Sequence, residues 1–246
     1  MTATLSIAKR EFRSYFNSPV AYVVICLALL ATGLLFFAWG GGFFQANRAS
    51  LQGMLSWVPW LMCFPVVPVI TMGLLAQERR SGTLEMLITM PVRDSEVIIG
   101  KFLGAWGLVM VLIFTTLIYP IMLFSVPWDL GAVDSGPVLT GYVGLILFSA
   151  AAVSIGLLVS ALTDSQIVSL FITVFLLVFM MAIGNRFTID ILPESLEFAA
   201  SFVGFDARLE GFFRGTVNTR DVVYFLTLTA GCLIGSFWAL ERRKWA

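Results

Sequence analysis

The sequence contains no histidine and only 12% charged residues, with 15 Lys plus Arg balanced by 15 Asp plus Glu in 246 positions. Soluble domains carry about 25% charged residues, so this composition excludes an ordinary water-soluble globular protein. The absence of histidine removes the commonest general base and a common metal ligand. A net charge of zero offers no basic field to a phosphate backbone, which excludes nucleic acid as a partner. Three widely spaced cysteines form neither a disulfide framework nor a zinc motif.

Apolar residues make up 59% of the chain and are concentrated in six runs long enough to cross a bilayer, which needs about 20 residues. The predicted spans are residues 20–39, 57–75, 102–124, 141–162, 167–184 and 222–240. We therefore predict an all-α membrane protein in which residues 1–246 form a single transmembrane domain. Pro59, Pro65 and Pro68 predict an irregular second span. Small residues between positions 149 and 156 predict close packing of the fourth.

Positive residues are unevenly divided between the two sides of the predicted bundle. Ten lie on one side: Lys9, Arg10, Arg13, Arg79, Arg80, Arg93, Lys101, Arg242, Arg243 and Lys244. Five lie on the other: Arg48, Arg186, Arg208, Arg214 and Arg220. Because the cytoplasmic side of a membrane protein carries the excess of Lys and Arg, we predict that both termini are cytoplasmic.

The six spans contain no Asp, Glu, Lys or Arg. Ionisable groups inside a membrane mark proton relays, ion pathways and voltage sensors. Their absence argues against an ion-coupled transporter, a cation channel and an intramembrane protease. We therefore expect the energy for any conformational change to come from outside the bilayer.

An amphipathic helix is predicted for residues 2–17, before the first span. Its apolar stripe consists of Leu5, Ala8, Phe12 and Phe16, whereas Lys9, Arg10 and Arg13 lie away from this stripe. Such a helix would lie in the membrane interface with its basic residues near anionic headgroups, and Pro19 would separate it from the first span. The alternative is a basic flank that sets the topology and is incidentally helical.

The loop between the second and third spans contains a second amphipathic pattern. Leu84, Leu87 and Ile88 recur at helical spacing. The charged residues around them are Glu78, Arg79, Arg80 and Glu85. A short helix of this kind can bind a partner protein, or it can merely cover the end of the bundle. The residues alone favour the two alternatives equally.

This loop resembles that of the type-2 ABC exporter permeases. The resemblance rests on Glu78, the segment Gly82-Thr83-Leu84-Glu85, Pro91, and Gly100-Lys101 at the start of the next span. The N-terminal segments Arg10-Glu11-Phe12 and Ser14-Tyr15-Phe16-Asn17-Ser18-Pro19 are similar to the same family, and look closest to its gliding-motility-associated branch. The layout of interfacial helix, six spans and long last outer loop is similar over the whole chain.

The resemblance implies a multi-pass permease of the bacterial inner membrane. Its loop would form a coupling helix that docks on a separate cytosolic ABC ATPase subunit, which favours the partner-binding alternative. That ATPase would bind ATP and Mg, so the chain itself would be neither an enzyme nor a cofactor-binding protein. No segment reads G-x-x-x-x-G-K-[ST], which agrees with this division of labour. A second copy of the chain or a related permease would complete the pathway.

The outer loop over residues 186–221 is too apolar for a free linker, and its pattern predicts one short helix around Leu192 to Val203 and another from Asp206 to Arg214. The resemblance implies that these helices re-enter the outer leaflet; an interfacial loop anchored by aromatic residues is the alternative.

We hypothesise an ATP-driven export permease with alternating access. A force-transmitting membrane anchor that acts on a periplasmic partner is the main alternative. A passive channel is disfavoured, because the spans offer no polar lining.

Overall fold

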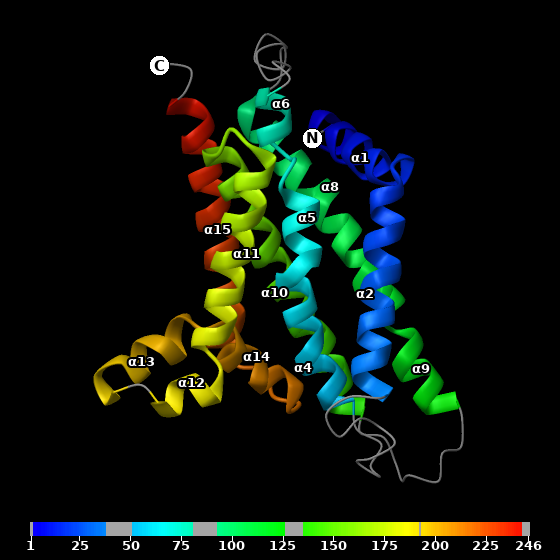
Figure 1. Cartoon of the computed structure of the whole chain (residues 1–246), viewed down its shortest axis with the longest axis vertical. Helices are drawn as coiled ribbons and strands as arrows, with labels where there is room; N and C mark the ends of the chain where they lie inside the picture. The colour runs from blue at the N-terminus through cyan, green and yellow to red at the C-terminus, as the bar shows by residue number, and fades with distance from the viewer. Residues whose placement is uncertain (1, 38–50, 81–92, 126–134, 192, 243–246) are drawn as a thin grey trace.

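The computed structural model describes residues 2–37, 51–80, 93–125, 135–191 and 193–242 (Figure 1). Within these ranges every regular element is a helix, which confirms the predicted all-α class. In chain order the elements are α1 (Thr2–Asn17), α2 (Pro19–Phe37), α4 (Gln52–Leu61), the π-helix η1 (Met62–Val66), α5 (Val67–Thr71), α6 (Ala76–Arg80), α8 (Asp94–Thr115), α9 (Ile118–Ser125), α10 (Ser135–Leu162), α11 (Gln166–Ile183), α12 (Arg186–Ile191), α13 (Glu194–Val203), α14 (Phe205–Phe213) and α15 (Thr219–Arg242).

Five helical stretches are long and apolar enough to cross a membrane. They are Gln52–Arg80, Asp94–Met122, Ser135–Leu162, Gln166–Ile183 and Thr219–Arg242. The helices α1 and α2, bent by 73°, give a sixth when they are counted as one broken span. These stretches follow the six predicted spans in order. Several begin before the predicted limits because a helix can continue through polar residues beyond the apolar run that marks the bilayer.

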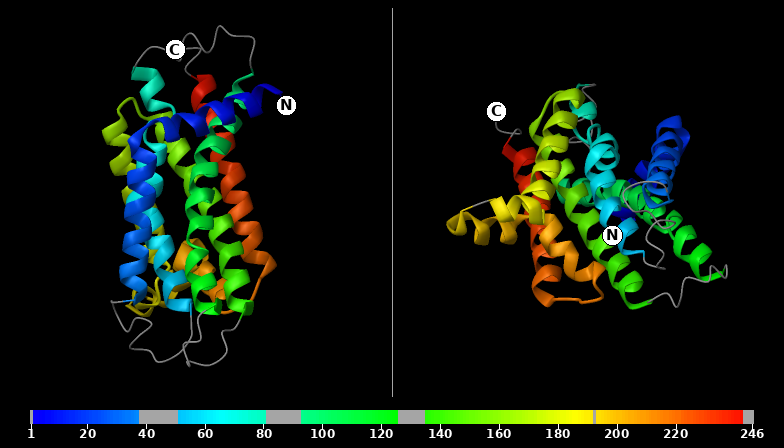
Figure 2. Two further views of the ribbon diagram at one scale, coloured as in Figure 1. Left: turned by 90° about the vertical axis from the view of Figure 1, so that its right-hand side faces the viewer. Right: turned by 60° about the horizontal axis from the view of Figure 1, so that its bottom comes forward.

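The two ends of the bundle carry different elements (Figure 1). At one end lie α1, α6 and the last turn of α15; we call this the inner end, after the predicted orientation. At the other lie α12, α13 and α14, and we call this the outer end. The left view of Figure 2 shows α1 crossing the inner end instead of continuing the direction of α2.

The second span is broken in the middle, as its prolines predict. Phe64 has non-helical torsion angles (φ −146°, ψ 108°), and the π-helix η1 surrounds it. Pro65 follows this break, and a proline nitrogen cannot donate to the helical hydrogen-bond ladder. The irregularity predicted for this span is therefore confirmed.

The third span, predicted over 102–124, is one apolar stretch, Asp94–Met122, with a local interruption. α8 ends at Thr115 and α9 begins at Ile118. Pro120 has no N–H to donate to the carbonyl of Thr116, four residues earlier. That carbonyl accepts a bond from the Tyr119 amide at 3.1 Å instead. Pro120 therefore interrupts the helix locally within this span, an irregularity that was not predicted.

α10 lies at the centre of the bundle and contacts α5, α8, α11, α14 and α15. Its small residues permit this close approach. A Cβ atom at Gly156 would lie 2.7 Å from the Cβ of Thr71 on α5, which is closer than two nonbonded carbons can approach. The indole Nε1 of Trp106 on α8 also donates to Ser149 Oγ at 3.0 Å. The close packing predicted for the fourth span is therefore confirmed.

α1 packs against α8 along a groove lined by three glycines, Gly100, Gly104 and Gly107. A Cβ at Gly104 would lie 2.6 Å from the Cβ of Glu11 and 3.1 Å from the carbonyl oxygen of Ala8. Helices can approach this closely only where side chains are missing from the contact. The groove therefore fixes which face of α1 is turned toward the bundle.

That face differs in part from the predicted stripe. Phe12 lies against Gly107, as expected of an apolar face. Leu5 is 68% exposed, and Ile7 lies against Gly100 in the groove. That the predicted stripe faces the membrane stays a prediction. The glycine groove of α8 determines how α1 is rotated about its own axis. The helical period of α1 alone does not reveal this.

The two short helices predicted in the outer loop are present as α13 and α14, and α12 is a third that was not predicted. α14 packs against α10, with Phe205, Leu209 and Phe212 fully buried. By contrast, Phe187 of α12 and Phe198 of α13 are 75% and 78% exposed. The right view of Figure 2 shows α12 and α13 projecting sideways from the bundle.

Asp206 of α14 is partly buried beside the end of α11. Its Oδ2 accepts a hydrogen bond from Asn185 Nδ2 at 3.1 Å. Burial, with repulsion from Glu210, outweighs this bond and the attraction of Arg186, and raises the pKa of Asp206 to about 6. The folded protein therefore holds the proton on this carboxyl more tightly than the unfolded chain does.

The raised pKa of Asp206 predicts a pH-dependent stability. A carboxyl whose pKa is raised on folding contributes full stability below its ordinary value of 3.8, and this contribution is lost as the pH rises through about 6. Asp206→Asn should therefore raise the thermal unfolding midpoint of the full chain in detergent at neutral pH and leave it unchanged near pH 3.8. Asp190→Asn, which alters an exposed carboxylate on α12, is the matched control. Equal effects of the two variants at neutral pH would contradict the assignment.

Candidate functional site

α6 is a five-residue helix at the inner end of the bundle, and it leads directly into residues 81–92. Seven residues of the predicted coupling helix lie outside the described ranges: Gly82, Thr83, Leu84, Glu85, Leu87, Ile88 and Pro91. The structure does describe the remaining four, which are Glu78, Arg79 and Arg80 on α6 and Lys101 on α8. The contacts of α6 therefore show how the segment before the loop is held.

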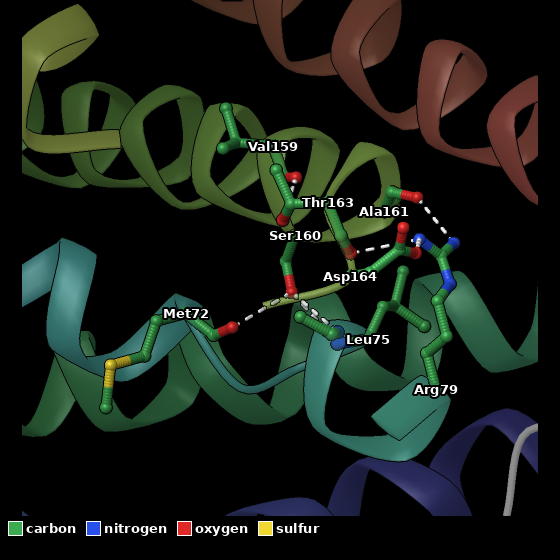
Figure 3. Close-up of polar contacts among 9 residues, drawn as sticks. Met72, Leu75, Arg79, Val159, Ser160, Ala161, Thr163 and Asp164 are labelled. Atoms are coloured by element: carbon green, nitrogen blue, oxygen red, sulfur yellow. Dashed lines mark hydrogen bonds and ion pairs between the residues drawn. The ribbon is translucent and has the colours of Figure 1, made fainter. Parts of the chain in front are cut away.

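The first turn of α6 is fixed to α10 by one hydroxyl group (Figure 3). The backbone amides of Leu75 and Ala76 donate to Ser160 Oγ at 3.0 and 3.1 Å. Ser160 Oγ itself donates to the carbonyl of Met72 at 3.3 Å. The first amides of a helix have no partner within it, so Ser160 supplies one from a neighbouring span.

Arg79 fixes α6 to the connection between α10 and α11 (Figure 3). Its Nη1 donates to the carbonyl of Thr163 at 2.9 Å and to Asp164 Oδ1 at 2.6 Å. Its Nη2 donates to the carbonyl of Ala161 at 2.8 Å. The last carbonyls of a helix lack partners within it and attract a cation. The Arg79 guanidinium therefore acts as a cap on the end of α10.

Glu78, the neighbour of Arg79, fixes α6 to α8 and, through Lys101, to α1. The ammonium group of Lys101 donates to Glu78 Oε1 at 2.7 Å and to Glu11 Oε1 of α1 at 2.9 Å. The Lys101 side chain is only 2% exposed. An unpaired ammonium ion removed from water costs several kcal/mol, and two carboxylates at hydrogen-bond distance offset that cost. We call Glu11, Glu78 and Lys101 the buried ion triad.

Tyr15 supplies a further link between α1 and the second span. Its hydroxyl donates to the carbonyl of Ile70 on α5 at 2.9 Å. Burial, with the nearby charge of Glu11, raises the pKa of the Tyr15 phenol above its usual range. The hydroxyl therefore stays protonated and available as a donor at physiological pH.

Together, these contacts make α6 a junction between two parts of the bundle. Glu78 reaches α8 directly and α1 through Lys101, whereas Arg79 and the start of α6 reach α10 and its connection to α11. We call this set of contacts the α6 junction. Within the described ranges no group of three or more His, Cys, Asp or Glu side chains is placed to hold a metal ion. The arrangement connects the segment before the loop to α8 and, through Ser160 and Arg79, to α10.

The structure brings together only part of the predicted site. Glu78, Arg79 and Lys101 belong to the α6 junction, while Arg80 is exposed. On α1, the aromatic residues Phe12 and Phe16 lie on the packed face, and Lys9, Arg10 and Arg13 are exposed. Glu11 was not among the predicted site residues. The signal that could have identified Glu11 was its position between Ala8 and Phe12 on the packed side of α1. A lysine at the start of an apolar run, Lys101, lies opposite it.

Comparison with known proteins gives one family. A family model described as an ABC-2 family transporter protein matches residues 42–240. No curated protein matches the chain. The matched range contains Glu78 and Lys101 of the buried ion triad, whereas Glu11 lies before it.

Lys101→Met should be strongly destabilising, because it leaves two carboxylates facing each other without the cation that they share. Removing one partner from a buried ion pair costs about 3–5 kcal/mol, to be measured as the free energy of unfolding of the full chain in detergent. Lys9→Met is the matched control; Lys9 is exposed on α1, and its loss should cost less than about 0.5 kcal/mol. A similar small effect for both variants would show that the triad contributes little.

Proposed function

The chain belongs to the ABC-2 family of transporter proteins, and we propose that it is the membrane-spanning permease subunit of an ATP-driven export system in a bacterial inner membrane. A separate cytosolic ABC ATPase binds ATP and Mg and docks on the coupling helix within residues 81–92. A second copy of this chain, or a related permease, completes the pathway. Assignment to the gliding-motility-associated branch stays a prediction.

The α6 junction is the observation that carries this proposal. α6 immediately precedes the proposed docking loop, and it is bonded to α8, α10 and the start of the α10–α11 connection. Lys101, at the other side of the loop, binds Glu78 and Glu11 together. A displacement of the loop would therefore reach both parts of the bundle without passing through a flexible segment.

The distribution of charge supports an external source of energy. Among the described residues, the buried charged side chains are Lys101 and Asp221, at the inner and outer ends respectively. Between these two ends, the described residues show no buried Asp, Glu, Lys or Arg of the kind that line the pathways of proton- or ion-driven transporters. The excess of Lys and Arg at the inner end agrees with a cytoplasmic location for that end.

The docking role of the loop predicts a loss of complex formation. Replacing Leu84 and Glu85 together with Ala should abolish co-elution of the chain with its ATPase in size-exclusion chromatography, because both the apolar contact and its charged flank are removed. Leu5→Ala, which alters a 68% exposed leucine at the same end, should leave co-elution unchanged. Retained binding with full stimulation of ATP hydrolysis in the double variant would contradict the docking assignment.

The α6 junction predicts a different defect when Arg79 is replaced. Arg79→Gln should keep the ATPase bound but lower the hydrolysis rate that the permease stimulates in proteoliposomes by about tenfold, because hydrogen bonds to a charged group contribute about 1.5–3 kcal/mol. Arg80→Gln makes the same change at an exposed neighbour and should have little effect. Loss of ATPase binding in Arg79→Gln alone would place this residue in the docking surface instead of the junction.

A further inference from the structure

A cavity of about 1000 Å³ lies at the outer end, between α13, α14 and the first turns of α15. Its walls are mainly apolar; they include Phe198, Phe202, Val223, Tyr224, Thr227 and Leu228. The buried ion triad does not contribute to it. The proposed function therefore leaves this cavity without a role.

One end of the cavity is polar and positively charged. There it adjoins a recess of about 490 Å³ that is lined by Arg208, Asn218, Thr219, Arg220 and Asp221. This end contains two guanidinium groups and one carboxylate, so its net charge is positive. Arg220 is exposed, and it makes no ion pair with the part of the chain that the structure describes.

The other arginine of the recess is held rigidly. Arg208 Nη1 donates to Asp221 Oδ1 at 2.8 Å, and its Nε and Nη2 donate to the carbonyl of Phe202 at 3.3 and 3.2 Å. Its guanidinium carbon lies 4.8 Å from the ring centre of Phe202 and 5.2 Å from that of Tyr224. These contacts join α13, α14 and α15 around the cavity, so its walls are preorganised.

The apolar wall of the cavity lies at the depth expected of acyl chains, and its charged recess at the depth expected of headgroups. Its apolar wall on α15 comprises Val223, Thr227 and Leu228, which fall in the first two turns of the predicted span 222–240. The charged recess lies just before that span, at the level where headgroups meet water. Exposed Phe187 and Phe198 on the adjacent helices also place apolar surface at this boundary.

We propose that this cavity binds one anionic phospholipid. The headgroup phosphate is held by Arg220 in the recess, and one acyl chain lies along Val223, Thr227 and Leu228. A guanidinium group forms strong, charge-assisted hydrogen bonds with phosphate. A zwitterionic headgroup would bring its own cation close to two arginines, which favours a lipid with net negative charge. The bound lipid would tie α13 and α14 to the outer leaflet beside α15.

The test is native mass spectrometry of the full chain in detergent, titrated with phosphatidylglycerol, phosphatidylcholine and inorganic phosphate. We expect one phosphatidylglycerol to bind about tenfold more tightly than phosphatidylcholine, as one charge-assisted contact permits. Arg220→Gln should remove this preference. Thr227→Trp, which fills the apolar part of the cavity from an exposed position, should weaken the binding of both lipids.

Arg214→Gln is the matched control, because Arg214 is an exposed arginine of the same outer loop that pairs with Glu210 and does not line the cavity. It should keep the full preference for phosphatidylglycerol. Equal affinity of the wild-type chain for both lipids would overturn the proposal, as would equal losses in Arg214→Gln and Arg220→Gln. Displacement of phosphatidylglycerol by inorganic phosphate at equal concentration would also overturn it, by showing a site for the free anion.

Discussion

The ammonium group of Lys101 is buried between two carboxylates, and the arrangement of the inner end depends on this interaction. Its partners, Glu11 and Glu78, belong to segments far apart in the sequence, so the desolvated charge can be satisfied only when α1, α6 and α8 are assembled together. The glycine groove of α8 brings α1 close enough for this contact. An electrostatic requirement and a steric one thus select the same position for α1, across the end of the bundle and bent away from α2.

A second ion pair joins the helices of the outer end. Arg208 and Asp221 connect α14 to α15, and the guanidinium also bonds the last residues of α13. Between the two ends, the bundle is held by apolar packing around α10 and by side-chain hydrogen bonds such as Trp106 to Ser149. Charge is therefore confined to the two regions where water or headgroups can solvate the remaining partners. This separation agrees with a permease that receives its driving force at one end and encounters the outer leaflet at the other.

The sequence predicted the helical class and the order of the spans, because long apolar runs have few alternatives in a membrane. It also predicted the break near Pro65, since a proline inside a span has a local effect. The break before Pro120 carried the same local signal and was missed. The roles of Glu11 and Ser160 could not be deduced, because they depend on contacts over 90 and 84 residues of sequence. The glycine groove of α8 sets the orientation of α1 and thereby leaves Leu5 exposed. The helical period of α1 holds no information about that groove.

On the proposed function, the buried ion triad makes α6, α1 and α8 move as one unit when the ATPase changes state. Electron–electron double resonance between spin labels at positions 80 and 9, in the assembled complex with and without nucleotide, measures whether they do. Both positions are exposed, so the labels need not disturb the triad. We expect an unchanged distance between these labels, and a distance from position 80 to an outer-end label at position 198 that shifts with nucleotide. A nucleotide-dependent change in the distance between positions 80 and 9 would contradict it.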